Sequence, residues 1–226
     1  MEQPHLPTRS LVSKCKRLTR LKLSVATLSD LNLSRSEEYR IVEQICDWER
    51  VAYGEGLHRR PESFFPCIEK NRSGFIVARS GNMLLGYADL WQLSPSFYAG
   101  LKIGEIDEES LAVSSVLATN DQPSGLWYVG SMICEAEYRK SSGLAGALLF
   151  AEICNYLPKF FSTQSRYPAS ILGVGSSSFG VKLLTRWAFA PVAKSSDAID
   201  HRPRYEKTLI CAEDAACFVI RARYVP

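Results

Sequence analysis

The sequence lacks the cysteine and histidine patterns that mark metal sites and disulfide frameworks. It has seven cysteines, an odd number without a CxxC pair, and only three histidines, His5, His58 and His201. No histidine stands at metal-ligand spacing from a cysteine or from another histidine, so the sequence gives no support for a zinc site. Several cysteines lie in apolar runs, where a free thiol behaves as a small hydrophobic side chain. We therefore expect no metal, no disulfide bonds and a reducing compartment.

Long apolar runs are also missing. No segment approaches the roughly 18 apolar residues that a membrane-spanning helix needs. The N-terminus carries Glu2, Pro4 and Pro7 before any apolar run, which is unlike a secretion signal. The sequence thus predicts a cytoplasmic protein without a membrane partner.

Charge is nearly balanced, with a formal net charge of +3 over 226 residues. The basic residues are dispersed except between Lys14 and Lys22, so nucleic acid is an unlikely main partner. A basic-tailed interaction protein that uses Lys14 to Lys22 on nucleic acid remains an alternative. We expect a basic extension over 1–20, one domain over 21–211 and a C-terminal segment, 212–226, packing on it. The sequence leaves a homodimer open.

Hydrophobic periodicity predicts alternating element types. Strands are expected at 22–27, 75–78, 84–93, 126–134, 169–174 and 204–211, and helices at 36–54, 143–156 and 179–187. The segment 58–71 is expected to be a short helix plus loop, and 94–122 a long, partly ordered surface excursion. Gly81-Asn82 predicts a hairpin turn, and the nearly continuous apolar run 126–134 predicts a strand in the middle of the sheet.

The segment after that central run has the composition of an anion-binding loop. Glycines and small residues, with Arg139 and Lys140, stand where the free N–H groups of a helix N-terminus point outward. The alternative is a plain helix start, whose small residues only allow close packing on the sheet. A GxxxxGK[ST] loop is absent, and Gly173-Val174-Gly175 lacks the third glycine of a dinucleotide fingerprint.

Residues Tyr138 to Leu149 resemble the acyl-CoA signature of the GNAT superfamily, which is Arg or Gln, two residues, Gly, any residue, then Gly or Ala. The run from Lys140 to Ala145 fits this spacing with Lys in place of Arg; alternatively, Arg139 is the family arginine and one serine is inserted. Trp187-Ala188-Phe189 is similar to the family's Gly-Phe corner, with Ala188 in place of Gly. The resemblance implies an α/β (α+β) fold, with a central mixed, largely antiparallel sheet splayed at its middle strands and helices on both faces.

The resemblance also implies acyl transfer, most simply of acetyl, from acyl-CoA to a primary amine of a small molecule or protein. The amine attacks the thioester directly in a ternary complex, with no covalent enzyme intermediate and no metal. Acetyl-CoA or another acyl-CoA is the expected cosubstrate. The residues expected to bind it are Ile133, Cys134, Arg139, Lys140, Ser141, Ser142, Gly143, Leu144, Ala145 and Gly146.

The catalytic groups are less well defined by the resemblance. Asp89 and Glu105, or Asp107, are candidates for the base that deprotonates the acceptor ammonium, and Tyr128, Tyr138 or a water for the acid. Family members commonly place a tyrosine five residues before the corner phenylalanine, as the acid that protonates the leaving thiolate. This sequence has Leu184 there, which cannot donate a proton. A CoA-binding sensor or regulatory module without catalysis is therefore the alternative function.

Overall fold

The computed structural model describes residues 23–54, 59–117, 125–135, 156, 161, 167–211 and 213–214. The expected anion-binding loop, 139–146, the helix that follows it and the basic extension, 1–20, lie outside these residues, as does most of the segment 212–226. The domain boundaries expected from the sequence stay a prediction.

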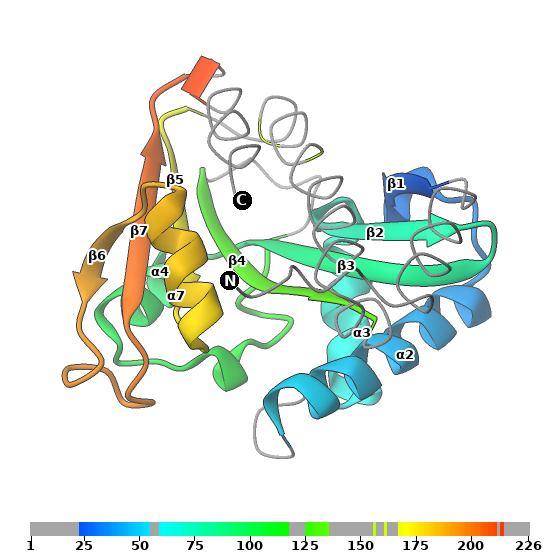
Figure 1. Ribbon diagram of the computed structural model, residues 1–226, viewed down its shortest axis with the longest axis horizontal. Coiled ribbons are helices and arrows are strands. Elements are labelled where there is room, and N and C mark those ends of the chain that lie inside the picture. Colours follow the sequence, from blue (N-terminus) through cyan, green and yellow to red (C-terminus); the bar gives the residue numbers. More distant parts are fainter. Residues whose placement is uncertain are drawn as a thin grey trace, which may run out of the picture.

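The described residues form a seven-stranded sheet with the order β1-β2-β3-β4-β5-β7-β6 (Figure 1). The strands are β1 (Leu23–Thr27), β2 (Phe75–Ser80), β3 (Met83–Gln92), β4 (Leu126–Cys134), β5 (Ala169–Val174), β6 (Ala190–Ala193) and β7 (Arg204–Leu209). β4 and β5 are parallel, and every other neighbouring pair is antiparallel. The predicted fold class, a mixed and largely antiparallel sheet, is confirmed. β6 was not predicted, because it is short and contains Pro191, which is tolerated mainly at a sheet edge.

The sheet opens between its two parallel strands. β4 pairs with β5 from Leu126 to Val129, whereas its pairing with β3 continues to Cys134. The second half of β4 therefore follows β3 and leaves β5, which ends at Val174. In Figure 1, β4 crosses the centre of the molecule between β1–β3 on one side and β5, β7 and β6 on the other. This is the splay that the family resemblance implies.

Helices cover both faces of the sheet. α2 (Arg35–Tyr53), α3 (Pro61–Lys70) and α4 (Pro95–Ile103) contribute to one apolar core, and α7 (Ser178–Arg186) contributes to the core on the other face. α2 begins with a capping box, in which Ser34 and Glu37 each accept a hydrogen bond from the other's backbone N–H. Three short 3₁₀ helices, η1 (Leu28–Asp30), η2 (Arg72–Gly74) and η3 (Glu108–Ser110), complete the described elements.

The expectation that 94–122 is a surface excursion is wrong for its first half. Ser94 caps α4, whose Phe97, Tyr98 and Leu101 are buried in the core. Gly104, at a φ of 82°, ends the helix, and η3 follows. The composition of this segment hid the helix because its apolar residues span only nine positions, too few for a clear helical period. The insertion between β3 and β4 is thus anchored to the body of the protein.

α7 ends in a Schellman motif at the corner that resembles the family's Gly-Phe pair. The N–H of Phe189 donates to the carbonyl of Leu184, and the N–H of Ala188 donates to the carbonyl of Thr185. Ala188 has a φ of 59°, the left-handed conformation that favours glycine. Leu184 and Phe189 pack in the same core, as is usual for this motif. Leu184 also lies over β5, where a Cβ at Gly173 would stand 2.5 Å from its Cδ2 atom.

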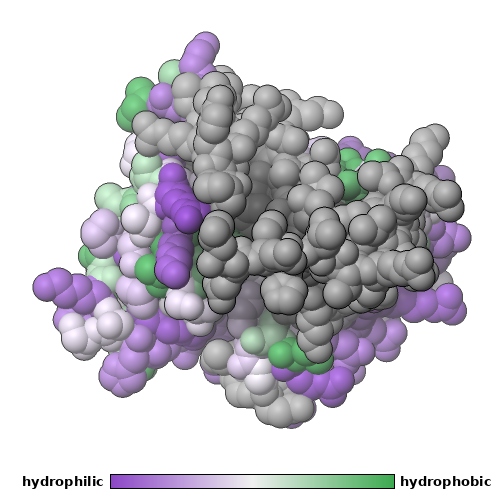
Figure 2. Space-filling model, in the orientation of Figure 1, coloured by the Kyte–Doolittle hydropathy of each residue, from purple (hydrophilic) through white to green (hydrophobic). Residues whose placement is uncertain are grey.

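The described surface is largely polar. On the face shown in Figure 2, hydrophobic residues are scattered among hydrophilic ones. Single exposed apolar side chains of this kind are normal for a folded domain. Among the described residues, no helix combines the length and the hydropathy that crossing a bilayer requires. The cytoplasmic location and the homodimer stay predictions.

Candidate functional site

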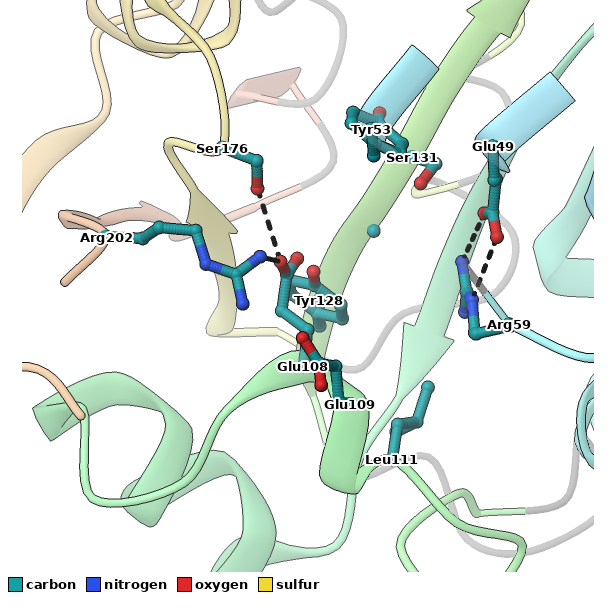
Figure 3. A pocket seen from close by; sticks show the side chains of 11 residues that line it. Glu49, Tyr53, Arg59, Glu108, Glu109, Leu111, Tyr128, Ser131, Ser176 and Arg202 are labelled. Atoms are coloured by element: carbon teal, nitrogen blue, oxygen red, sulfur yellow. Dashed lines mark hydrogen bonds and ion pairs between the residues drawn. The ribbon is translucent and has the colours of Figure 1, made fainter. Parts of the chain in front are cut away.

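A pocket lies on the α2–α4 face of the sheet, where β4 leaves β5. It encloses about 520 Å³ of empty space, part of which is open solvent. Its walls come from the end of α2, η3, the middle of β4, the turn after β5 and the segment before β7 (Figure 3). The lining residues are Glu49, Tyr53, Arg59, Glu108, Glu109, Leu111, Tyr128, Gly130, Ser131, Ser176 and Arg202.

A bulge in β4 forms the floor of this pocket. Between the pairs Ala88↔Met132 and Leu90↔Val129, Asp89 alone faces both Gly130 and Ser131. The extra residue shifts the alternation of side chains, so that both bulge residues line the pocket. Asp89 accepts a hydrogen bond from the backbone N–H of Ser131. A side chain at position 130 would overlap the Asp89 carboxylate and stand 3.1 Å from Nε1 of Trp91, which explains the glycine.

One wall is a buried charge network centred on Arg59. Its Nη2 lies 2.7 Å from Oε1 of Glu49 and 2.8 Å from Oδ2 of Asp89. The guanidinium also lies 3.8 Å from the ring centroid of Phe64, a cation–π contact. Tyr87 donates its hydroxyl to Glu49 at 2.7 Å. The two carboxylates are 1% and 0% exposed, so the network is a fixed, desolvated part of the site.

Burial and charge act in opposite directions on the carboxyls of this wall. Burial raises the pKa of Asp89 above its ordinary 3.8, and Arg59 only partly offsets this. Burial also raises the pKa of Glu49, but the Arg59 charge and the hydrogen bonds from Arg59 and Tyr87 outweigh it and hold that pKa below 4.5. Glu49 is therefore ionised at neutral pH.

The opposite wall carries Glu108, on η3. It forms an ion pair with Arg202 and accepts a hydrogen bond from the Ser176 hydroxyl at 3.2 Å. Burial raises the pKa of Glu108 from 4.5 to about 7, although Arg202, Arg59 and Ser176 each lower it. The side chain is still 20% exposed, so a ligand in the pocket can reach it. A carboxyl with a pKa near neutrality can accept and return a proton at working pH.

Arg204 braces the segments that carry this second wall. It is fully buried, and its Nη1 and Nη2 each lie 3.0 Å from an oxygen of Asp200. Its Nε donates to the carbonyl of Leu101 at 2.9 Å, and Nη1 donates to the carbonyl of Arg202 at 2.7 Å. One side chain therefore ties α4 to the β6–β7 connection. Because η3 follows α4, this brace holds Glu108 and Arg202 on the same side of the pocket.

The structure brings some of the sequence-predicted residues to this site and places others elsewhere. Tyr128 lines the pocket from β4. Asp89 lies beneath it with both carboxylate oxygens engaged. Glu105 is exposed in the turn after α4, outside the pocket lining. Ile133 and Cys134 are buried on opposite faces of β4, beyond its pairing with β5.

The residues from Arg139 to Gly146 lie outside the described part of the chain. The five charged lining residues, Glu49, Arg59, Glu108, Glu109 and Arg202, were not singled out from the sequence. Glu108 belongs to the acidic run that begins at Glu105, but no local pattern distinguishes it from its neighbours. Among the described residues, no cluster of metal ligands is found, and the absence of a metal stays a prediction.

Comparison with known proteins gives similarity at the level of structure. No known family's sequence profile matches the chain, and no curated protein matches it. Ard1 from Thermoplasma volcanium is 8% identical, with a TM-score of 0.48, covering 83% of this chain and 98% of that one. Arabidopsis thaliana Naa50, solved with the bisubstrate analogue CoA-Ac-MVNAL, is 10% identical, with a TM-score of 0.46 and coverages of 84% and 100%. A GNAT-family acetyltransferase from Staphylococcus aureus Mu50 is 11% identical, with a TM-score of 0.46 and coverages of 83% and 99%.

The family resemblance at residues 138–149 implies a mixed, largely antiparallel sheet that opens between its middle strands, and the described residues have both features.

Proposed function

We propose that this chain transfers an acyl group, most simply acetyl, from acyl-CoA to a primary amine bound in the pocket described above. The observation that carries the proposal is the position of Glu108, a largely buried carboxyl with a pKa of about 7, in a pocket at the open end of the β4–β5 splay. The family resemblance implies acyl-CoA as the acyl donor, and the pocket is the proposed binding site of the acceptor amine.

Glu108 is the base in this proposal. An amine attacks a thioester only in its neutral form, so the acceptor ammonium first gives a proton to the Glu108 carboxylate. The amine nitrogen then forms a bond to the carbonyl carbon, and the bond from that carbon to the CoA sulfur breaks. The leaving thiolate takes a proton from Tyr128, which lines the same pocket, or from water, and the second proton that the acylated nitrogen loses restores this donor. Arg202 and Ser176 hold Glu108 in place.

Asp89 and Glu105 fit the role of base less well. Asp89 holds Arg59 and the Ser131 N–H with its two oxygens, so it positions the bulge rather than facing the pocket. Glu105 is exposed outside the pocket lining, where its carboxylate is solvated. Acyl-CoA would be bound by Ile133 and Cys134 of β4, next to the splay, and by Arg139 to Gly146.

Release of the CoA thiol in the presence of a broad panel of amines tests the activity. With an accepted amine, Glu108→Gln should lower kcat/KM by at least about 100-fold, because the amide cannot take up the proton. The matched control Glu43→Gln changes an exposed carboxyl on α2, outside the pocket lining, and should have no effect. A comparable loss in Glu105→Gln, with Glu108→Gln unaffected, would assign the base to the rival residue.

Binding of the cosubstrate has a separate test. Acetyl-CoA and longer acyl-CoAs should raise the melting temperature of the protein, whereas NAD should not. Gly143→Glu should abolish this rise, because the added carboxylate would repel the pyrophosphate. If CoA compounds produce no shift, the central part of the proposal fails.

Leu184 favours a second candidate, a CoA-binding sensor or regulatory module without catalysis. The side chain at the position of the expected acid is buried in the apolar core and packs over Gly173. Tight binding of CoA without thiol release from any amine tested would support this function over acyl transfer.

A further inference from the structure

Among the described residues around the pocket, carboxyl groups outnumber guanidinium groups. The wall built on Arg59 contributes to this excess. One guanidinium is shared by two carboxylates, those of Glu49 and Asp89. Both carboxylates are buried, so bulk water does little to stabilise the excess charge. This wall therefore holds two carboxyl groups against one guanidinium, so it gives the pocket no excess positive charge.

The opposite wall is balanced when Glu108 is ionised. Its charges alternate along a chain in which Arg202 pairs with Glu108 and Asp200, and Asp200 pairs in turn with Arg204. Two carboxylates thus face two guanidinium groups. Both arginines that line the pocket, Arg59 and Arg202, are already bound to carboxylates, so neither is available for a carboxylate of the acceptor.

Glu109 adds an exposed carboxylate to the pocket lining. It follows Glu108 on η3, lines the pocket and is exposed to solvent, which places it at the mouth. Between the charged walls lie Tyr53, Leu111 and Tyr128, which offer apolar surface. Among the described residues, the pocket thus combines more carboxyl than guanidinium groups with apolar contacts, and a cationic ligand with an aliphatic part matches both.

We infer that the acceptor is a small diamine, in which a second ammonium group is joined by a short aliphatic chain to the amine that is acylated. This inference rests on the proposed function. One ammonium lies at Glu108, gives up its proton and is acylated, while the other keeps its charge and faces the excess negative charge. A monoamine leaves part of that charge unmatched, and an amino acid adds a carboxylate to a pocket whose arginines are occupied.

Three acceptors of equal chain length separate the possibilities: 1,4-diaminobutane, butylamine and 4-aminobutanoate. The diamine should exceed butylamine in kcat/KM by about five- to tenfold, mostly through KM, because the second ammonium contributes to binding and not to the reaction. The amino acid should be the poorest. The preference for the diamine should shrink as salt is raised.

Glu109→Gln tests the origin of the preference. It should reduce the ratio of diamine to monoamine by about three- to fivefold, because it removes one exposed charge. Glu43→Gln makes the same chemical change at an exposed position of α2 outside the pocket and should leave the ratio unchanged. Equal use of diamine and butylamine, or a preference for the amino acid, would overturn the inference while leaving acyl transfer in place.

Calorimetric titration separates the two proposals. With CoA present, 1,4-diaminobutane should bind more tightly than butylamine, and Glu109→Gln should weaken its binding. Diamine binding without thiol release would show that the pocket selects a diamine and would refute the diamine as the acyl acceptor. Absence of diamine binding, with thiol release from other amines, would overturn the inference alone, and absence of both would overturn both.

Discussion

Glu108 should make the protein less stable as pH rises, and Glu108→Gln should remove this loss. A carboxyl with an ordinary pKa of 4.5 and a folded-state pKa of about 7 binds its proton more tightly in the folded chain. Between these two values the folded state carries a proton that the unfolded state has lost. The free energy of unfolding therefore falls as pH rises from about 4.5 to 7 and levels off above 7.

The size of the effect follows from the same pKa. The shift corresponds to an upper value of about 3 kcal/mol, and partial access of water to the side chain lowers it to about 2 kcal/mol. Because glutamine cannot ionise, the difference in free energy of unfolding between Glu108→Gln and wild type should increase by this amount from pH 5 to pH 8. Loss of the ion pair with Arg202 changes the free energy of unfolding of Glu108→Gln at every pH, but the difference from wild type still increases as pH rises.

Urea denaturation at four pH values between 5 and 8 measures this difference, since the contributions of other titrating groups largely cancel between the two proteins. Glu43→Gln, which alters an exposed carboxyl, should follow wild type across the range. Parallel curves for wild type and Glu108→Gln would refute the reasoning, because they would mean that the folded protein does not shift the pKa of Glu108. The same shift predicts that kcat/KM rises with pH through about 7.

Three further predictions concern the framework of the site, and urea denaturation measures each. Ala188→Gly should stabilise the protein by about 0.5–1 kcal/mol, because a φ of 59° strains alanine. Ala52→Gly, in the last turn of helix α2, should instead destabilise it by up to about 1 kcal/mol, and equal signs would contradict this reasoning. Gly130→Ala should lower the free energy of unfolding by about 1–3 kcal/mol and also lower kcat/KM, because the added methyl group overlaps the Asp89 carboxylate. A fully active and stable variant would show that the bulge adjusts freely. Arg204→Leu should lower the free energy of unfolding by about 2–4 kcal/mol, because Asp200 keeps only Arg202 as a partner and the carbonyls of Leu101 and Arg202 lose their donor. Exposed Arg50→Leu should lower it by less than about 1 kcal/mol, and similar losses would exclude the brace.

Local sequence patterns were sufficient for most of the sheet. The alternation and turn at Gly81-Asn82 predicted the hairpin, and the apolar run from Leu126 to Cys134 predicted the strand that lies in the middle of seven. The corner at Ala188 was expected from the family resemblance at Trp187-Ala188-Phe189, and the structure has a helix end there. Such features are encoded within a few residues, so they can be read without knowing the partners in space.

The candidate site depended on tertiary structure. Glu108 and Arg202 are 94 residues apart, and the burial that raises the pKa of Glu108 comes from segments that meet only in the folded chain. The bulge at Gly130 depends on the register with β3, and the helix before η3 depends on core contacts rather than on a visible period. Sequence alone therefore determined most of the strands, and the donor loop expected from it stays a prediction. Only the fold decided which carboxyl is desolvated, because desolvation and charge pairing depend on neighbours that are distant along the chain.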